Sequence, residues 1–296
     1  MKVLLLCLLM VAACEDAAEP LVLSPMPTFV PVVVTAKTEP KPPPLKVLAK
    51  YETKFKAGDR GYNIELLTKT LHDTVLEPGD EFRFNKAAGP RTLERGFREA
   101  PAYFVGEVIP TLGGGTCQVS STLHAAALYA GLEITSRRPH SRPSKYIPAG
   151  LDAMVNYPES CVDPEKADPR VCSDLRFRNP FDFPIKLWFG AKSEGVDGSA
   201  VLRVHVVGKG PVPEVSTRWL ASGRPEFKTR YRRVIYWKDE RGHRKRLKQS
   251  GHPGLTGVLY IDMVHPDGKK ETRRVASRYR PTIEVFNVGM DYEIPE

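Results

Sequence analysis

Three consecutive glycines that lead into an apolar helical pattern constrain this chain more than any other feature. Residues 113–123 read Gly-Gly-Gly-Thr-Cys-Gln-Val-Ser-Ser-Thr-Leu. Glycines allow a tight turn, and the apolar spacing that follows is typical of a helix that ends at Gly131. The sequence therefore predicts a turn and then a buried helix, with Cys117 at or just before its first turn. The apolar face of this helix is expected to hold Val119, Leu123, Ala126, Ala127 and Ala130.

The position of Cys117 favours a reactive thiol. Unpaired backbone N–H groups and the positive end of the helix dipole stabilise a thiolate at a helix start. A nucleophilic cysteine needs such an environment, so we take Cys117 as a candidate nucleophile. The alternative is a small buried residue that only helps the helix to pack.

Candidate partners for the thiol follow along the chain. A cysteine hydrolase needs an imidazole beside the thiolate and a third group that orients the ring. His140 follows the predicted helix, and Asp152 lies on a predicted strand, with Asp174 as a further option. The order Cys, His, Asp is also that of transglutaminase-like and papain-like folds, an analogy of layout alone. The alternatives are a histidine that anchors a loop and a structural acid.

Five further residues are candidates for substrate binding. Amides around Gly115 and Gln118 are placed to stabilise an oxyanion, and Ser120 is a polar partner or a helix cap. Arg91 and Arg138 are suited to bind a carboxylate or phosphate through two hydrogen bonds each. Surface salt bridges would explain these two arginines equally well.

The first 14 residues resemble a bacterial lipoprotein signal peptide. A basic start precedes an apolar run over residues 3–13 that is too short to span a bilayer, and it ends in Val-Ala-Ala-Cys at Cys14. The resemblance implies export and a lipid anchor on Cys14, on the periplasmic face of the bacterial cell envelope. An ordinary secretory leader is the alternative. Clustered prolines over residues 15–45 predict a semi-extended tether.

Two further cysteines, Cys161 and Cys172, flank a polar loop that contains two prolines. In an oxidising envelope they are able to pair, and this predicted disulfide leaves Cys117 as a free thiol. A metal site is not expected, since CxxC and HxxxH spacings are absent, and no cofactor is expected. A disulfide that includes Cys117 is the remaining alternative.

The region from residue 46 to residue 210 predicts an α+β domain, in which a central helix packs on a mostly antiparallel sheet. A second helix is expected over residues 62–74, with a Pro-Gly turn and a strand within 76–85. The segment 179–182 is interpreted as a hairpin turn. Further strands are expected over residues 102–108, 151–157, 174–178, 185–190 and 200–207.

Many short motifs occur in one order between residues 51 and 190. They are Thr53, Phe55, Arg60, Asn63-Ile64, Pro78-Gly79, Phe82, Phe84-Asn85, Gly89, Arg91-Thr92, Gly96, the segment 113–123, and then 138–141, 146–148, 150–153, 174–179 and Pro184-Ile185. Together they resemble the VanW family, which takes its name from an accessory protein of vancomycin-resistance clusters. The resemblance implies an envelope context but no particular reaction. The insert that carries Cys161 and Cys172 departs from the family pattern.

The C-terminal region, residues 211–296, predicts a small all-β domain. Spaced glycines set in strand-like runs make it similar to a G-five domain, which is associated with cell-wall amino sugars. Tyr236, Trp237 and Tyr260 are candidates for stacking on sugar rings. Core or cross-strand packing is the alternative for all three.

The net charge of +9 is concentrated in residues 224–248, which contain eleven lysines and arginines but only three acidic residues. Such a run often indicates nucleic-acid binding, but an exported protein does not meet that partner. We expect peptidoglycan or an anionic cell-wall polymer instead, with a solvated β-surface as the alternative.

Two functions are therefore open. One is an envelope enzyme, a cysteine hydrolase or acyltransferase that acts on peptidoglycan peptide or its precursors through Cys117, His140 and Asp152. The other is a non-catalytic protein that binds the cell wall or its glycan and has a structural Cys117. Proximity of an accessible Cys117 thiol to His140 favours the first.

Overall fold

The computed structural model describes residues 45–104, 107–157, 161, 172–193, 198–233, 245–290 and 292–295, all within one compact unit, Pro43–Glu296. The predicted leader with Cys14, nearly all of the predicted tether, Tyr236 and Trp237 lie outside the described residues. Within these ranges, no helix is long and apolar enough to cross a membrane.

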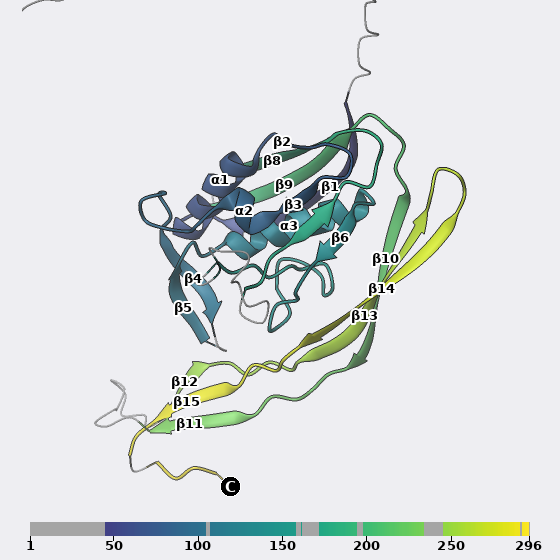
Figure 1. Ribbon diagram of the computed structural model, residues 1–296. Coiled ribbons are helices and arrows are strands. Elements are labelled where there is room, and N and C mark those ends of the chain that lie inside the picture. Colours follow the sequence, from purple (N-terminus) through teal and green to yellow (C-terminus); the bar gives the residue numbers. More distant parts are fainter. Residues whose placement is uncertain are drawn as a thin grey trace, which may run out of the picture. The chain divides into compact units, whose positions relative to one another are not determined.

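The largest sheet is four-stranded and antiparallel, with the order β1-β9-β8-β2 (Figure 1). Residues alternate along its strands, so that Leu187 and Phe189 are buried while Trp188 between them is 37% exposed. The buried face packs against α1 (Asp59–Leu71) and α3 (Thr116–Tyr129). The strands are β1 (Lys46–Lys56), β2 (Thr74–Leu76), β8 (Ile185–Ser193) and β9 (Ser199–Gly208).

Helix α3 lies at the centre of the packing, as the sequence predicts. Its predicted apolar face joins the core beneath the large sheet. Ala125 and Leu128 face elsewhere and pack in a second cluster with Leu259, Ile261 and Met263 of strand β13 (Leu255–Val264). Because apolar neighbours cover the helix from two sides, twelve of its residues are buried.

Smaller elements complete this part of the fold. Strands β3 (Glu81–Arg83), β6 (Glu133–Ser136) and β7 (Arg176–Arg178) form a sheet with the order β3-β7-β6. Strands β4 (Glu99–Phe104) and β5 (Glu107–Leu112) form a two-stranded sheet. The mixture is a sheet-rich α+β arrangement, in agreement with the predicted class.

Several predicted elements are wrong in extent or type. Helix α1 begins at Asp59 rather than at residue 62. The strand predicted through Phe84 ends at Arg83, and α2 (Phe84–Ala88) follows at once, because the Asn85 amide is capped by the Asp174 carboxylate. The single strand predicted over 102–108 belongs instead to the antiparallel pair β4 and β5.

Two further predicted elements are absent. Residues 152–157 form no strand: Ala153 N donates to Ser121 Oγ at 3.0 Å, while Met154 N and Asn156 N donate to the backbone oxygens of Arg138 and Ser173, which lie in two different segments. The segment 179–182 is not a hairpin, because it connects β7 and β8, which belong to different sheets. The buried Asn179 side chain holds it there by donating to Leu76 O and Phe183 O.

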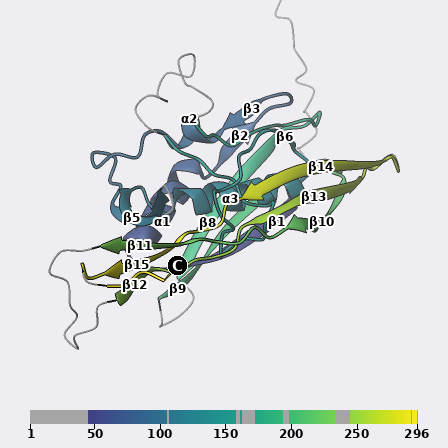
Figure 2. The same cartoon turned by 90° about the horizontal axis from the view of Figure 1, so that it is seen from below.

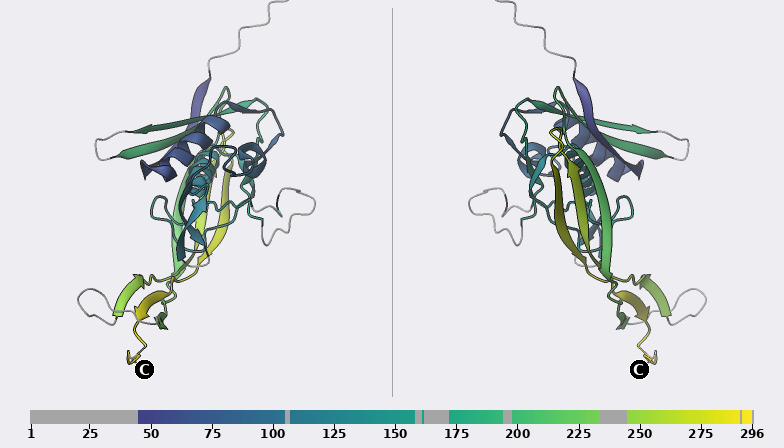
Figure 3. Two further views of the ribbon diagram at one scale, coloured as in Figure 1. Left: turned by 90° about the vertical axis from the view of Figure 1, so that its left-hand side faces the viewer. Right: turned by 90° about the vertical axis from the view of Figure 1, so that its right-hand side faces the viewer.

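The C-terminal region contains two three-stranded sheets, in the orders β10-β13-β14 and β11-β15-β12. The first is antiparallel, whereas β11 and β15 pair in parallel. The chain passes between the sheets after β10, before β13 and after β14 (Figures 2 and 3). The predicted boundary at residue 210 stays a prediction. The remaining strands are β10 (Glu214–Gly223), β11 (Thr229–Arg233), β12 (Lys245–Gln249), β14 (Lys270–Tyr279) and β15 (Glu284–Val288).

Candidate active site

The glycine turn delivers Cys117 to the first turn of α3. Gly115 has φ of 110°, which L side chains rarely adopt, and a Cβ on Gly114 would lie 2.5 Å from Ala100 O. The Asn63 side chain fixes the turn by donating to Gly114 O at 3.0 Å. The loop therefore requires glycine for both conformation and space, and α3 begins at Thr116.

Cys117 is partly exposed and is the free cysteine of the described residues. Its thiol donates to Val155 O at 3.2 Å. Burial raises the pKa of this thiol, but hydrogen bonding with His140, the charge of that imidazole, the Val155 carbonyl and the Arg91 guanidinium lower it more. The net effect is a pKa below the usual value, which is the electrostatic condition for a nucleophilic cysteine.

His140 is held by the carboxylate of Asp152. One oxygen, Asp152 Oδ2, lies 2.7 Å from His140 Nδ1 and accepts the His140 backbone N–H at 2.7 Å. Burial lowers the pKa of the imidazole, but Asp152 and Cys117 raise it to about 9. Because Asp152 occupies Nδ1, Nε2 is the nitrogen available for the thiol proton. The three residues proposed from the sequence therefore form one connected arrangement.

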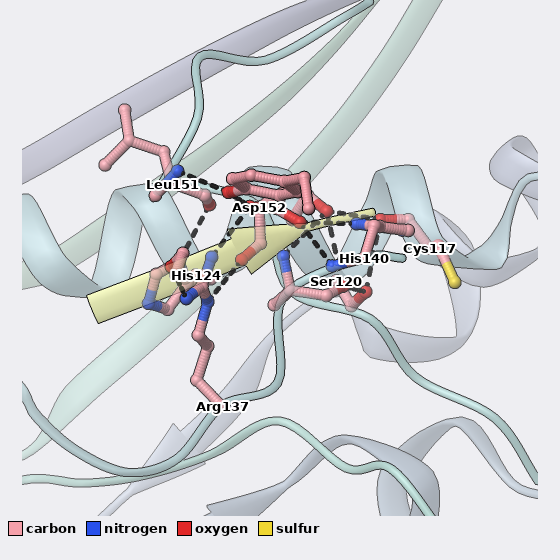
Figure 4. A network of polar contacts seen from close by, with 12 residues as sticks. Cys117, Ser120, His124, Arg137, His140, Leu151 and Asp152 are labelled. Atoms are coloured by element: carbon pink, nitrogen blue, oxygen red, sulfur yellow. Dashed lines mark hydrogen bonds and ion pairs between the residues drawn. The ribbon is translucent and has the colours of Figure 1, made fainter. Parts of the chain in front are cut away.

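Asp152 is almost fully buried, with 1% of its side chain exposed. Burial raises the pKa of its carboxyl, but the hydrogen bond with His140 and the charges of Arg137 and His140 hold it well below the usual range. Arg137 donates from Nη2 to Asp152 Oδ1 at 2.7 Å and from Nε to Asp152 O at 2.6 Å. Figure 4 shows this network, with Cys117 at one end.

The polar face of α3 fixes the segment that carries Asp152. Ser120 Oγ donates to Ala153 O at 2.7 Å, and the His124 ring bonds through Nδ1 to Leu151 O at 2.8 Å (Figure 4). Burial lowers the pKa of His124 to about 4, so this imidazole is neutral at pH 7. Ser120 therefore links α3 to the segment that carries Asp152 and does not act as a helix cap.

The sequence contains a signal for this polar face. Cys117, Ser120, Ser121 and His124 follow the i, i+3, i+4, i+7 spacing of one helix face. Arg137 has no comparable local signal, because its partners come from distant parts of the chain.

Two arginines bring positive charge toward the thiol. Arg60 Nη1 donates to Gln118 Oε1 at 2.7 Å, and its guanidinium lies over the Tyr146 ring. Arg91 donates to Gly89 O and to Asn85 Oδ1. Burial lowers the pKa of Arg91 to about 10, so it stays charged at neutral pH. Within the described part of the chain, neither guanidinium forms an ion pair with a carboxylate.

The other predicted binding residues have different surroundings. The Gln118 side chain is buried and engaged at both ends, since its Nε2 donates to Thr53 Oγ1 and Lys54 O while Oε1 accepts from Arg60. Its backbone N–H donates to Gly115 O at 2.9 Å. Arg138 donates to Ser173 Oγ at 3.1 Å. The ring of Tyr260 lies beneath the Arg218 guanidinium, 4.5 Å from its Cζ.

The structure confirms the predicted disulfide between Cys161 and Cys172. The neighbouring Ser173 N–H donates to Asn156 Oδ1, and Asn85 Nδ2 donates to Ser173 O at 3.0 Å. The disulfide-linked chain is thereby attached to the segment that carries Asp152 and Val155. Among the described residues, no group of three or more His, Cys, Asp or Glu side chains is placed to hold a metal ion.

Comparison with known proteins supports the VanW family for the part of the chain that contains these residues. Residues 59–201 match the family model described as VanW like protein. The uncharacterized protein YoaR of Bacillus subtilis is 34% identical over 160 residues, which cover 53% of this chain and 47% of that protein. The vancomycin B-type resistance protein VanW of Enterococcus faecalis is 25% identical over 141 residues, 46% of this chain and 47% of that protein. The chain thus spans about half the length of these relatives.

Proposed function

We propose that this protein is a cell-envelope thiol enzyme, a hydrolase or acyltransferase that acts on the peptide part of peptidoglycan or its precursors. The observation that carries the proposal is the connected arrangement of Cys117, His140 and Asp152. Cys117 is the nucleophile, His140 the general base and acid, and Asp152 the group that orients the imidazole.

The site enters the reaction with the thiol proton already on His140 Nε2, because the pKa of the imidazole is raised to about 9 and that of the Cys117 thiol is lowered. The thiolate sulfur then forms a bond to the acyl carbon of the substrate, and the carbonyl electron pair moves to oxygen. The C–N bond breaks, and the amine leaves with the proton of the imidazolium. Water, or a second amine, attacks the thioester with His140 as the base and releases Cys117.

The start of α3 supplies a site for the oxyanion of this reaction. The N–H groups of Thr116 and Gln118 donate to Gly113 O and Gly115 O, respectively. Among the turn and cap bonds of the described residues, the Cys117 N–H has no acceptor. That amide, at the positive end of the helix dipole, is therefore the best placed to stabilise the developing negative charge.

The charges of Arg60 and Arg91 favour a substrate that carries a carboxylate near the reacting bond. Buried cations are stabilised by negative partners, and in this site the thiolate is one such partner. A peptide stem of the cell wall presents free carboxylates as well as amide bonds. The predicted lipoprotein leader and the name of the Enterococcus relative, which ties that protein to vancomycin resistance, support the same envelope context.

A non-catalytic, wall-binding role is the second candidate. The observation that favours it is the hydrogen bond from the Cys117 thiol to Val155 O, which is a contact that a packing cysteine also makes. On this reading the ion pair of His140 and Asp152 holds the loop, and sugar rings bind elsewhere on the chain. This reading predicts a thiol without special reactivity.

Alkylation of the full chain by iodoacetamide between pH 5 and pH 10, with mass spectrometry of the peptide that contains Cys117, separates the two candidates. The enzyme proposal predicts an apparent thiol pKa below the reference of about 8.5, and loss of this shift in His140→Ala. Cys117→Ser is then tested for loss of amidase or transfer activity on peptidoglycan fragments. An ordinary thiol pKa that does not change in His140→Ala would refute the proposal.

A further inference from the structure

Strand β14 of the C-terminal region brings two hydroxyl groups to the carboxylate that orients His140. Ser277 and Tyr279 are two residues apart, so they lie on the same face of the strand. Both are buried, with 3% and 0% of their surfaces exposed. Tyr279 Oη donates to Asp152 Oδ1 at 2.5 Å, across 127 residues of sequence.

The two oxygens of Asp152 have different partners. Oδ2 is bound to His140, through the ring Nδ1 and the backbone N–H. Oδ1 accepts from Tyr279 Oη and from Arg137 Nη2. One side of the carboxylate therefore faces the imidazole, while the other is held by groups that depend on the C-terminal sheet.

The direction of the Tyr279 hydrogen bond is determined by a second contact. Gly150 N–H donates to Tyr279 Oη at 2.7 Å, so the hydroxyl directs its own proton to Asp152. Burial, the charge of Asp152 and the hydrogen bond to Asp152 raise the pKa of Tyr279 to about 12, which keeps the hydroxyl protonated at physiological pH.

Strand β14 also acts on Asp152 through Arg137. The guanidinium donates from Nη1 to Ser277 Oγ at 2.6 Å while Nη2 binds Asp152 Oδ1. With only 4% of its side chain exposed, Arg137 has little freedom to adopt another arrangement. Ser277 therefore fixes the plane of the guanidinium that neutralises Asp152.

Close packing maintains this contact. A Cβ on Gly150 would lie 3.0 Å from the Leu259 Cβ and 3.1 Å from the Trp219 ring. Leu151, next to Asp152, belongs to the apolar cluster that includes Leu259 and Ile261 of β13. The sheet β10-β13-β14 thus packs directly against the two residues that precede Asp152.

We propose that the sheet β10-β13-β14 is part of the thiol site, and that Tyr279 is a positioning residue that acts on His140 through Asp152. The inference rests on the proposed function of Cys117, His140 and Asp152. Tyr279 does not touch the reacting atoms. Its hydroxyl holds Asp152 so that the carboxylate faces the imidazole and sustains the charge on His140 that stabilises the thiolate.

The test is the pH profile of Cys117 alkylation in the full chain carrying Tyr279→Phe, which removes one hydroxyl and keeps the ring. Without this hydroxyl the carboxylate is no longer held facing the imidazole, so we expect the apparent thiol pKa to rise and alkylation at pH 7 to slow about 3- to 10-fold. Ser277→Ala, which acts through Arg137, is expected to shift the profile in the same direction by less.

Two controls separate positioning from stability. Met263→Ala shortens a buried side chain four residues beyond Leu259 on β13 and should lower the melting temperature without moving the pH profile. Tyr260→Phe removes a hydroxyl from a neighbouring strand of the same sheet and should change neither the melting temperature nor the pH profile. Circular dichroism reports the fold of each variant, and Ser277→Ala serves as the test if Tyr279→Phe does not fold.

The outcomes distinguish this inference from the function on which it rests. A wild-type profile in Tyr279→Phe and Ser277→Ala, together with a shifted profile in His140→Ala, would overturn the role of β14 and leave the thiol site intact. A profile that is ordinary in the wild type and unchanged in His140→Ala would refute the proposed function itself.

Discussion

At the scale of single residues, the site is a chain of opposite charges buried behind a partly exposed thiol. Arg137 neutralises Asp152, Asp152 stabilises the positive charge of His140, and His140 lowers the pKa of Cys117. Removing one member of such a buried arrangement leaves its partner charge uncompensated, which costs more than a surface ion pair contributes.

The pH dependence of stability follows from these pKa shifts. Asp152 has a lowered pKa, so its contribution is present above the unfolded value of about 3.9 and is lost as pH falls through the folded value. His140 has a raised pKa, so its contribution is complete below about pH 6.5 and is lost as pH rises through about 9. Urea denaturation from pH 4 to pH 10 should show the highest free energy of unfolding between about pH 4 and pH 6.5, where both contributions are present.

The variant Asp152→Asn tests the same network. It leaves the charges of Arg137 and His140 unbalanced, so we expect the free energy of unfolding at pH 7 to fall by about 3–5 kcal/mol. The decrease in stability between pH 7 and pH 9 should also become smaller, because His140 loses its charged partner. Glu81→Gln, at a more exposed ion pair with Arg83, is the matched control and should cost less than about 1 kcal/mol. Equal effects of the two variants would contradict the network.

At the scale of elements, α3 combines a packing face with a polar face that organises the site. The apolar residues join the core, while Ser120, Ser121 and His124 bind the segment from Leu151 to Ala153. The turn before the helix is equally constrained, since Gly115 combines a positive φ with contact to Arg60 O. A change in this turn would therefore move both the thiol and Arg60.

Substitution of Gly115 by alanine tests the turn. A Cβ would lie 2.9 Å from Arg60 O on a backbone with φ of 110°, so we expect a loss of about 2–4 kcal/mol and slower Cys117 alkylation. Gly223→Ala is the matched control, because no atom lies within 4 Å of its Cβ position. Thermal unfolding of both variants measures the difference, and equal melting temperatures would show that the turn tolerates a side chain.

Local patterns predict α3, its start near Cys117 and the order of the three site residues, because glycine conformation and helical spacing act within a few residues. They do not predict that Asp152 lies outside any strand, since both backbone groups of the next residue, Ala153, are bonded by serine side chains of α3. Arg137 and Tyr279 escape sequence reasoning for a related reason. Their partners are 15 and 127 residues from them in sequence, so only the packing of complete sheets brings them together.

At the scale of the whole molecule, α3 contributes to two apolar clusters at once. Val119 and Leu123 belong to the core beneath the large sheet, and Ala125 and Leu128 belong to the cluster formed with β13. The helix thus couples the stability of the C-terminal sheet to that of the rest of the compact unit. We therefore expect residues from both regions to unfold in one transition.

The variant Ile261→Ala tests this coupling. Ile261 is 6% exposed, so truncation should cost about 2–4 kcal/mol. If unfolding is a single transition, far-UV circular dichroism and exposure of the Cys117 thiol should shift together along the urea axis. Val264→Ala is the control, because Val264 is 39% exposed at the end of the same strand. It should shift neither the circular dichroism transition nor the exposure of the Cys117 thiol. Separate transitions for the two signals would show that the C-terminal sheet unfolds independently.

The place of Tyr279 in the chain has a consequence for biosynthesis. Translation proceeds from the N-terminus, so Cys117 and His140 are synthesised well before strand β14 (Lys270–Tyr279) is available to complete the hydrogen bonds of Asp152. On the proposed role for Tyr279, a nascent or prematurely terminated chain carries a thiol of ordinary reactivity. The late arrival of one strand would protect the emerging polypeptide from its own nucleophile.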